Sequence, residues 1–487
     1  MSLSKSTYCN GLQCKKMIWL LKNKLYEKGE DSSDYIKEKG IEVHDVGKNY
    51  FGDHIEIEYN DDLQKMVDET KKLLKNNNLV ITEASFIYNN NFCSIDILKK
   101  ENDKYEIYEI KGTNKLKDIH IDDVSFQYFV LKNLGLKITK CSLLLINSDY
   151  KRKGNLELKK LFKEIDITKE VKEKQREVKN NIDCINNCLY EAEPNIDLGE
   201  YCFLPYACPF FNYCTKKLPE KNVFKIRKLK KDIKLKLYKD KVYSFEDALN
   251  SDIDDYYKIQ LNHEINDLDD QIDKEKIKEF MDTLSYPLYF LDFETFSSTI
   301  PLYDDSRPNE QIPFQYSLHY IEKINGELKH KEFLSESGID PRRKLAEQLV
   351  KDIPLNVCTL AYNMKFEKSV IHNLAEIYPD LEEHLMNIYY NIKDLMIPFE
   401  KRYYYNKDMD GSYSIKYVLP ALFKDDDRLN YHNLDLIQNG VDAMTSFRDL
   451  ENKSEKEQEY IRERLLRYCE LDTYAMVKIY EKLKDII

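Results

Sequence analysis

The chain has 487 residues, with 75 Lys or Arg against 87 Asp or Glu and a formal net charge of −12. At 42% apolar and 33% charged residues it is too apolar for wholesale disorder, and 13 Gly and 13 Pro argue against a collagen-like or low-complexity architecture. The acidic total does not exclude nucleic acid as a partner, because binding it needs only a local basic path. At roughly 100–200 residues per domain, two to four domains are expected.

No apolar run is long enough for a membrane span, and residues 1–20 lack an apolar signal core with a small-residue cleavage site. We therefore expect a cytoplasmic protein with no membrane partner. The 11 Cys are an odd number, and a reducing compartment disfavours structural disulfides. Clustered Cys are accordingly expected to be metal ligands.

Residues 1–218 are predicted to form an α/β domain with a helical start and a strand-rich middle. Apolar runs bounded by polar turns predict its strands at Leu79–Phe86, Phe92–Leu98, Glu106–Lys111 and Thr139–Ile146. The polar stretch Lys100–Lys104 is expected to be a hairpin turn. A helix is predicted over Asp122–Leu136, with Gly135 ending it.

The predicted hairpin carries a set of charged residues suited to phosphodiester cleavage. Asp96 lies on one strand, and Glu109 and Lys111 lie two residues apart on the next, so the last two share a face. If Asp96 lies opposite them, the two carboxylates can hold Mg²⁺ or Mn²⁺ while the ammonium stabilises developing charge. The alternative is that these are solvent-facing charges without a function.

Four cysteines form a second candidate metal site. Cys202, Cys208 and Cys214 follow a C-x5-C-x5-C spacing, and Cys14 lies far upstream, where Cys9 competes with it for the fourth place. Four thiolates suit an iron-sulfur cluster or a structural zinc ion. Because C-x2-C knuckles are absent, the cluster is favoured over zinc.

The order Cys14, Asp96, Glu109, Lys111, a Gln-Tyr helix at Gln127 and three late cysteines resembles the iron-sulfur nucleases of the PD-(D/E)XK superfamily, which include RecB-like and CRISPR adaptation nucleases. The resemblance implies a [4Fe-4S] cluster on Cys14, Cys202, Cys208 and Cys214, and DNA cleavage at Asp96, Glu109, Lys111 and Gln127. It also implies that His44, in a G-x3-H pattern, is a metal ligand. Glu83 is another carboxylate near this site and is a candidate to support or replace His44. The first cysteine spacing departs from the usual C-x2-C of these nucleases.

Residues 219–284 are predicted to be a small helical connector that is first basic and then acidic. Between Thr215 and Val242 the sequence has twelve Lys or Arg against three acidic residues. Such a run is either a solvated helix face or a path for nucleic acid.

Residues 285–487 are predicted to form a second α/β domain with its own carboxylates. Asp292 and Glu294 lie on a very apolar strand, which should not bury two acids unless they bind something. Tyr468 and Asp472 are four residues apart on a predicted helix and so share a face. Glu367 follows another apolar strand between them.

This set resembles the motifs of DEDD-type exonucleases in an RNase H-like fold, in the subtype with Tyr. The resemblance implies that Asp292, Glu294, Glu367 and Asp472 bind two metal ions while Tyr468 orients water for 3′-to-5′ cleavage. Glu367 stands where the group usually has Asp, which puts activity in doubt, and Asp394 is a reserve candidate. Gln315, Tyr316 and His319, with nearby aromatic and basic residues, are expected to suit stacked bases and phosphates.

The full arrangement resembles an uncharacterised prokaryotic family, filed as a domain of unknown function, that joins a RecB-like nuclease to an RNase H-like exonuclease. We therefore expect a metal-dependent nuclease acting on DNA in preference to RNA, with two sites of opposite polarity. Two alternatives stay open: one site is inactive, or the chain is a nucleic-acid-binding scaffold with protein partners in a mobile-element or phage-defence complex.

Overall fold

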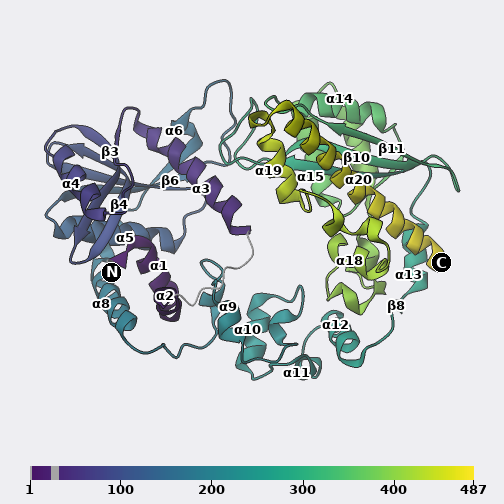
Figure 1. Cartoon of the computed structure of the whole chain (residues 1–487), viewed down its shortest axis with the longest axis horizontal. Coiled ribbons are helices and arrows are strands. Elements are labelled where there is room, and N and C mark those ends of the chain that lie inside the picture. Colours follow the sequence, from purple (N-terminus) through teal and green to yellow (C-terminus); the bar gives the residue numbers. More distant parts are fainter. Residues whose placement is uncertain (1–2, 24–31) are drawn as a thin grey trace. The chain divides into compact units, whose positions relative to one another are not determined.

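The structure, a computed structural model, describes residues 3–23 and 32–487 of a mixed α/β chain (Figure 1). It divides into two compact units: unit 1 is Met1–Lys217 with Ser298–Glu310, and unit 2 is Leu218–Ser297 with Gln311–Ile487. The predicted connector, residues 219–284, belongs to unit 2, and the short segment 298–310 belongs to unit 1. Within the described ranges, no helix combines the length and the apolar character needed to cross a bilayer.

Unit 1 is built on one mixed sheet. Its strands are β1 (Leu3–Ser4), β2 (Ile55–Glu56), β3 (Leu79–Tyr88), β4 (Asn91–Glu101), β5 (Lys104–Lys111), β6 (Lys137–Ile146) and β7 (Phe162–Asp166). Strands β2 to β7 lie in sequence order, and β1 pairs with the start of β4. The β3-β4-β5 part is antiparallel, whereas β5 and β6 run parallel and are joined by a helix, as a parallel crossover requires.

Helices cover the sheet of unit 1. They are α1 (Lys5–Gln13), α2 (Lys15–Lys22), α3 (Ser32–Lys48), α4 (Leu63–Leu73), α5 (Asp118–Asn133), α6 (Leu158–Leu161), α7 (Thr168–Glu173), α8 (Gln175–Tyr190) and α9 (Phe211–Thr215). Ile107 of β5 packs in a core with residues of α1, α5 and α8, whereas its neighbours Tyr108 and Ile110 pack in a second core with Val43 of α3. This alternation along β5 sets which residues face α5, and Glu109 is one of them.

The predicted strands of unit 1 are present, with differences at their ends. Strands β4 and β5 extend into the expected Lys100–Lys104 turn, so only Asn102 and Asp103 lie between them, with Asn102 at a φ of 53°. Such a two-residue turn needs the left-handed backbone that Asn tolerates. Helix α5 begins at Asp118, earlier than expected, and Gly135 follows its end with a φ of 86°.

Unit 2 is built on a five-stranded sheet in the order β11-β10-β9-β12-β13. The strands are β9 (Leu288–Phe296), β10 (Ile312–Ile321), β11 (Leu328–Leu334), β12 (Cys358–Ala361) and β13 (Ile392–Asp394). Strands β9, β10 and β11 pair antiparallel, and β12 and β13 continue parallel to β9. The central strand is therefore β9, which carries Asp292 and Glu294.

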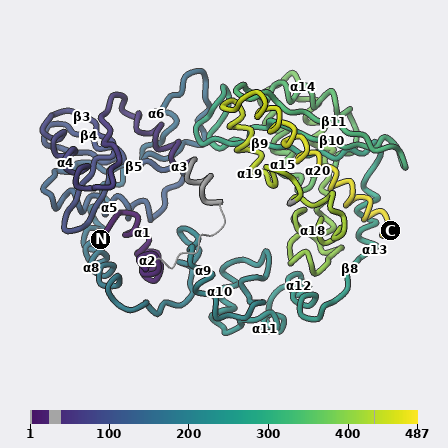
Figure 2. Tube along the Cα trace, in the orientation of Figure 1, coloured from purple at the N-terminus to yellow at the C-terminus, as the bar shows by residue number. Residues whose placement is uncertain are grey.

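The two faces of this sheet differ in character. One face packs in an apolar core with α14 (Arg342–Asp352), α15 (Lys365–Ile377) and α16 (Glu382–Asn391), and includes Leu291, Tyr316 and Leu318. The other face lies under α19 (Gly440–Arg448) and the long α20 (Glu455–Ile486), drawn in yellow in Figure 2. A capping box between Ser454 and Glu457 starts α20.

The remaining elements of unit 2 are short. They are α10 (Lys231–Lys239), α11 (Phe245–Leu249), α12 (Asp255–Asn266), β8 (Gln271–Ile272), α13 (Lys274–Met281), α17 (Ile397–Glu400), β14 (Tyr404–Tyr405) and α18 (Ile415–Leu422). The segment from Val223 to Ile265 has a small apolar core of its own, which includes Phe245 and Leu261. It is thus a folded helical part rather than an extended linker.

Candidate functional site

The acidic residues predicted on the hairpin of unit 1 lie side by side on neighbouring strands. The strand registers place Glu83 of β3 opposite Asp96 of β4, and Asp96 beside Glu109 of β5. Asp96 and Glu109 are buried, with 5% and 1% exposure, and Asp96 Oδ2 accepts a hydrogen bond from the Ile110 amide at 2.8 Å. With Asp123 of α5 added, these four carboxylates are called the unit 1 site.

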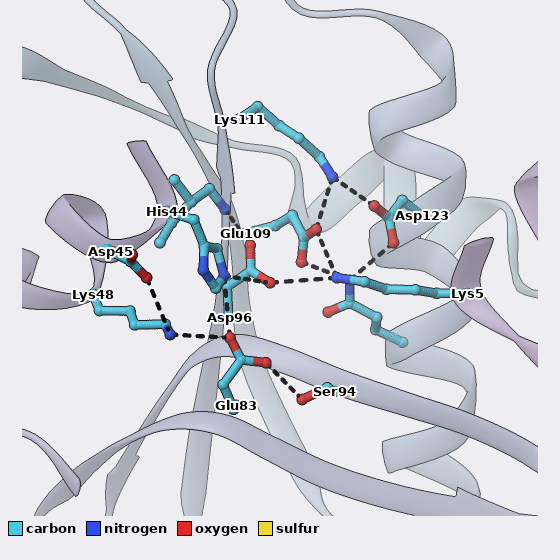
Figure 3. A network of polar contacts seen from close by, with 12 residues as sticks. Lys5, His44, Asp45, Lys48, Glu83, Ser94, Asp96, Glu109, Lys111 and Asp123 are labelled. Atoms are coloured by element: carbon cyan, nitrogen blue, oxygen red, sulfur yellow. Dashed lines mark hydrogen bonds and ion pairs between the residues drawn. The ribbon is translucent and has the colours of Figure 1, made fainter. Parts of the chain in front are cut away.

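Lys5 and Lys111 place two ammonium groups against Asp96, Glu109 and Asp123 (Figure 3). Lys5 Nζ, from the first residue of α1, is 3.3 Å from Asp96 Oδ1 and 2.9 Å from Glu109 Oε1, and so lies between the two acids. Lys111 Nζ is 2.7 Å from Glu109 Oε1 and 2.6 Å from Asp123 Oδ2. Lys111 was predicted, whereas Lys5 was missed because no local spacing connects it to residues far along the chain.

Helix α5 supplies an amide and a further carboxylate. Gln127 Nε2 donates to Glu109 Oε2 at 2.7 Å and to Asp123 Oδ1 at 3.0 Å. Gln127 Oε1 is buried with no hydrogen-bond partner among the described residues. Gln127 was predicted, and Asp123, which was not, could have been found from its position four residues before Gln127 on the same helix face.

Helix α3 closes the other side of the site. His44 Nε2 is 3.2 Å from Glu83 Oε1 and 3.4 Å from Asp96 Oδ1, and Lys48, one turn further on, is 3.5 Å from Glu83 Oε1. Glu83 has a φ of 57°, a strained value for a side chain of this size. Ser94 Oγ donates to Glu83 Oε2 at 2.9 Å. The structure thus brings the predicted His44 and Glu83 to the same carboxylates.

The positively charged side chains of Lys5, His44 and Lys111 set the electrostatics of the unit 1 site. Burial opposes ionisation of Asp96, yet the charges of Lys5 and His44 hold its pKa below the usual range. The pKa of Glu109 is also lowered, since Lys111 and Lys5 outweigh burial and the repulsion from Asp96. Conversely, against the effect of burial, Asp96 and Glu109 raise the pKa of Lys5. Asp96 and Glu109 are therefore ionised and compensated by side chains of the chain itself.

The four predicted cysteines line one pocket, called the thiol pocket. Cys14 lies between α1 and α2, and Cys202, Cys208 and Cys214 come from the loop that ends at α9. Cys9 is absent from this lining; its thiol instead lies near Asp123 and Lys111. Gln13 at the end of α1 donates to the carbonyls of Tyr201 and Tyr206, each at 2.7 Å, and so ties this helix to the cysteine loop.

The carboxylates predicted in unit 2 also converge, from three elements. Asp292 and Glu294 come from β9, Glu367 from the first turn of α15, and Asp472 from α20; these four are called the unit 2 site. Ligand atoms of Asp292, Glu294 and Cys469 lie within 4.8 Å of one another. Oε2 of Glu367 is buried without a hydrogen-bond partner among the described residues.

Two tyrosines hold Asp472. Tyr431 donates its hydroxyl to Asp472 Oδ1 at 2.5 Å, and the predicted Tyr468 also hydrogen bonds to Asp472. Tyr431 was missed, since nothing distinguishes it among the 37 Tyr of the sequence. Tyr431 also lines a pocket of about 490 Å³. The lining consists of nine residues of the segment 416–431, among them Lys416, Lys424 and Tyr431, together with Gln438 and Asn439. This pocket adjoins the unit 2 site through Tyr431, which contacts Asp472.

The electrostatics of the unit 2 site are the reverse of those in unit 1. Burial, then the charges of Asp472, Glu294 and Glu367, raise the pKa of Asp292 well above its usual value. Burial likewise raises the pKa of Glu367 to about 8 and that of Asp472 to about 6. Lys416 is the cation that opposes this shift at Glu294 and Asp472, and it does not outweigh burial.

The reserve candidate and the residues expected to contact bases take other positions. Asp394 caps the turn before α15, accepting from the amides of Asn363 and Met364 at 2.9 and 3.1 Å. Tyr316 is fully buried and donates to Asp352 at 2.6 Å, so the expectation that it stacks on bases is wrong. Gln315 and His319 are buried under α20 and are equally inaccessible to a base.

Comparison with known proteins gives a family without an assigned activity. Residues 289–414 match the family described as "Domain of unknown function (DUF2779)", a stretch that includes Asp292, Glu294 and Glu367 but not Asp472. The chain is similar to "Uncharacterized protein MG366" of Mycoplasma genitalium, with 26% identity over 231 residues, and to its homolog of Mycoplasma pneumoniae, with 28% over 229. Each match covers 44% of this chain and 34% of the relative. The chain thus spans about a third of the length of these relatives.

Proposed function

We propose that the chain is a divalent-cation-dependent nuclease with one phosphodiester-hydrolysing site in each unit. The observation that carries the proposal is the unit 2 site, where four carboxylates from three elements lie together and repel one another; Glu294 and Glu367 are buried, and Asp292 and Asp472 are half-buried. Buried acids without a compensating cation are costly, and binding divalent metal ions is the common reason for keeping them. Hard oxygen ligands of this kind suit Mg²⁺ or Mn²⁺.

The structure of unit 2 supports an RNase H-like exonuclease of the DEDD type. Asp292 and Glu294 lie on the central strand of a mixed sheet, and the orphaned Oε2 of Glu367 adds an acceptor that a metal ion would use. Asp292, Glu294, Glu367 and Asp472 would hold the ions, which supply an activated water and stabilise the transition-state charge. Glu367 thus fits the role that the related enzymes usually give to Asp.

The other residues of unit 2 have roles that follow from their contacts. Tyr431 and Tyr468 both hydrogen bond to Asp472 and so fix its orientation. Tyr468 is the group proposed to position the attacking water, as the resemblance implies. Lys416 lies at the pocket and close to Glu294 and Asp472, where its ammonium would attract a phosphate.

The unit 1 site supports a PD-(D/E)XK-type nuclease centre. Asp96 and Glu109, with His44 beside them, would hold the metal ion, and Lys111 would stabilise charge on the scissile phosphate. Gln127 holds both Glu109 and Asp123 and so orients the two acids that in turn hold Lys111. A metal ion shared by Asp96 and Glu109 would require the Lys5 ammonium to move aside.

The thiol pocket supports an iron-sulfur cluster better than zinc. Four zinc-bound thiolates, at about 2.3 Å from the ion, lie roughly 3.8 Å apart, whereas a cluster of several atoms holds them further apart. Among the described residues, no three of these four thiols lie within 4.8 Å of one another, although all four line one pocket. Iron and sulfide analysis of anaerobically purified protein tests this proposal; stoichiometric zinc would contradict it.

A second candidate function is favoured by the position of Lys5. Its ammonium occupies the place between Asp96 and Glu109 that a shared cation would take. In this case unit 1 is a metal-free, ion-paired centre that binds nucleic acid without cutting it, and unit 2 alone hydrolyses the substrate. A scaffold with protein partners in a defence or mobile-element system is the extreme form of this alternative.

The test is degradation of end-labelled DNA and RNA in Mg²⁺ or Mn²⁺. Asp292→Asn is expected to abolish one polarity of degradation and Asp96→Asn the other, with DNA cut in preference to RNA. Two exposed carboxylates serve as matched controls: Asp103→Asn, in the turn of the β4-β5 hairpin, and Asp485→Asn, on the same helix as Asp472. If Asp96→Asn leaves all activity intact, unit 1 is not a nuclease; if the wild-type chain cuts no substrate, the proposed function is wrong.

A further inference from the structure

The face of the unit 2 sheet beneath α20 carries a second group of polar side chains beside the carboxylates, since Ser317 of β10 pairs with Asp292 of β9. Along β10, Ser317 and His319 point to this face and are buried, whereas Leu318 between them packs in the apolar core of the opposite face. The register pairs Ser317 with Glu332 and His319 with His330 of β11. Two neighbouring rungs of the sheet are therefore polar on the face that α20 covers.

Three metal-ligating side chains meet on this face. One ligand atom each from His319, His330 and Glu470 of α20 lies within 4.8 Å of the others, and the two imidazole centroids are 4.4 Å apart. Glu332 lies on the same face of β11, two residues from His330 and paired with Ser317. We call His319, His330 and Glu470 the histidine cluster.

A pair of hydroxyl groups links the two imidazoles. Thr473 Oγ1 lies 2.7 Å from Ser317 Oγ, 2.8 Å from His319 Nδ1 and 3.1 Å from the carbonyl oxygen of Glu470. Ser317 Oγ in turn lies 2.9 Å from His330 Nε2.

This network uses one ring nitrogen of each imidazole, Nδ1 of His319 and Nε2 of His330. The other ring nitrogen of each, Nε2 of His319 and Nδ1 of His330, is therefore the one able to coordinate a metal ion. Holding the second ring nitrogen in a hydrogen bond is the usual way in which proteins orient a ligating histidine.

We propose that His319, His330 and Glu470 form a binding site for one transition-metal ion of the Zn²⁺ type, separate from the unit 2 site. Two imidazoles and one carboxylate are a ligand set for Zn²⁺ rather than for Mg²⁺, which prefers oxygen ligands. Glu332 or water would complete the coordination. The site does not depend on the proposed nuclease activity.

A metal ion bound by Glu470 would have a structural consequence for helix α20. Glu470 lies on α20 between Tyr468 and Asp472, and the two histidines lie on β10 and β11. An ion held by all three side chains would fasten α20 to the sheet close to the helix positions that reach the unit 2 site. Metal binding would thus fix the helix that presents Asp472.

Equilibrium dialysis of the full chain against Zn²⁺, in excess Mg²⁺ and followed by metal analysis, tests the site. Wild type is expected to retain one Zn²⁺ more per chain than His330→Gln or Glu470→Gln. Two matched controls, His372→Gln and Glu459→Gln, both at exposed positions outside the cluster, are expected to retain as much as wild type. Because Glu470 is exposed, its substitution is not expected to affect folding, which circular dichroism checks.

Thr473→Val tests the hydrogen-bond network separately. It keeps the volume of the side chain and removes the hydroxyl that holds His319, so Zn²⁺ affinity is expected to fall about 10- to 100-fold. Hydrogen exchange gives a readout that needs no enzymatic activity: Zn²⁺ should slow exchange in α20 of wild type and not of Glu470→Gln. Equal zinc content in wild type, His330→Gln and Glu470→Gln, or no slowing in α20, would overturn the proposal.

Discussion

The two acidic sites of this chain have similar residues and opposite electrostatics. In the unit 1 site, Lys5, Lys111 and His44 lie against the carboxylates, and the pKa values of Asp96 and Glu109 are lowered. In the unit 2 site the carboxylates mainly face one another, and the pKa values of Asp292 and Glu294 are raised. Clustered carboxylates alone therefore do not define a metal site. The cationic side chains that the protein places beside the carboxylates decide how much of their charge is left for a metal ion to neutralise.

The largest expected effect is on hydrolysis by unit 2. Asp292→Asn removes a central ligand, so we expect the rate of the polarity assigned to unit 2 to fall by about 10³-fold, which single-turnover degradation of end-labelled DNA measures. Glu367→Asp should retain activity if the carboxylate itself is what matters. A Glu367→Gln variant with wild-type rates would remove Glu367 from the metal site.

The next effect distinguishes the two tyrosines of unit 2. If Tyr468 positions water, Tyr468→Phe lowers kcat by about 10²-fold. Tyr431→Phe should cost less, since Asp472 keeps its hydrogen bond from Tyr468. Comparing kcat for the two variants checks this order, and a larger loss for Tyr431→Phe would transfer the role of water positioning to Tyr431.

A smaller effect is expected at Lys5, which separates the two candidate functions of unit 1. Replacing it by Gln removes the ammonium that competes with a metal ion, so Mn²⁺ affinity of the unit 1 site should rise roughly tenfold, about 1.4 kcal/mol. Titration of Asp292→Asn protein, in which the unit 2 site is weakened, measures this affinity. Unchanged binding in Lys5→Gln would show that Lys5 does not occupy the cation position.

The last effect is on stability rather than on rate or metal affinity, namely the dependence of stability on pH without divalent ions. Carboxyls with raised pKa, such as Asp472 at about 6 and Glu367 at about 8, keep protons in the folded state that the unfolded chain loses near pH 4. Unit 2 should therefore lose stability as the pH rises from about 4 to about 8. The lowered pKa values in unit 1 have the opposite sign, so its stability should fall as the pH drops below about 4. Hydrogen exchange in β9 and β4 as a function of pH measures both.

Local patterns in the sequence were enough to predict the strands that carry the acids, whereas β1, β2 and β7 of unit 1 were not predicted. Asp292 and Glu294 stand out because two acids in an apolar strand must serve a purpose, and Glu109 and Lys111 stand out because they share a face two residues apart. Gln127 and Tyr468 came from the resemblance to nucleases. The hairpin turn was predicted too long because the polar Lys100 and Lys104 were not recognised as strand residues.

Contacts between distant segments could not be predicted in the same way. Lys5 reaches Asp96 and Glu109 only because β1 pairs with β4 and thereby brings the start of α1 to the sheet. His319 was expected to suit bases and phosphates, since a single sequence does not tell which face of β10 lies under α20. The alternation of Gln315, Ser317 and His319 was a signal of a polar face, but not of its burial.

The same substitution in both sites tests the central contrast most directly. Without divalent ions, Asp96→Asn takes a partner from Lys5 and His44 and should destabilise β4 by about 3 kcal/mol in hydrogen exchange. Asp292→Asn relieves repulsion among acids and should stabilise β9 by on the order of 1 kcal/mol. Opposite signs for the two variants are the predicted result; destabilisation of both strands would contradict the account of an uncompensated acidic cluster in unit 2.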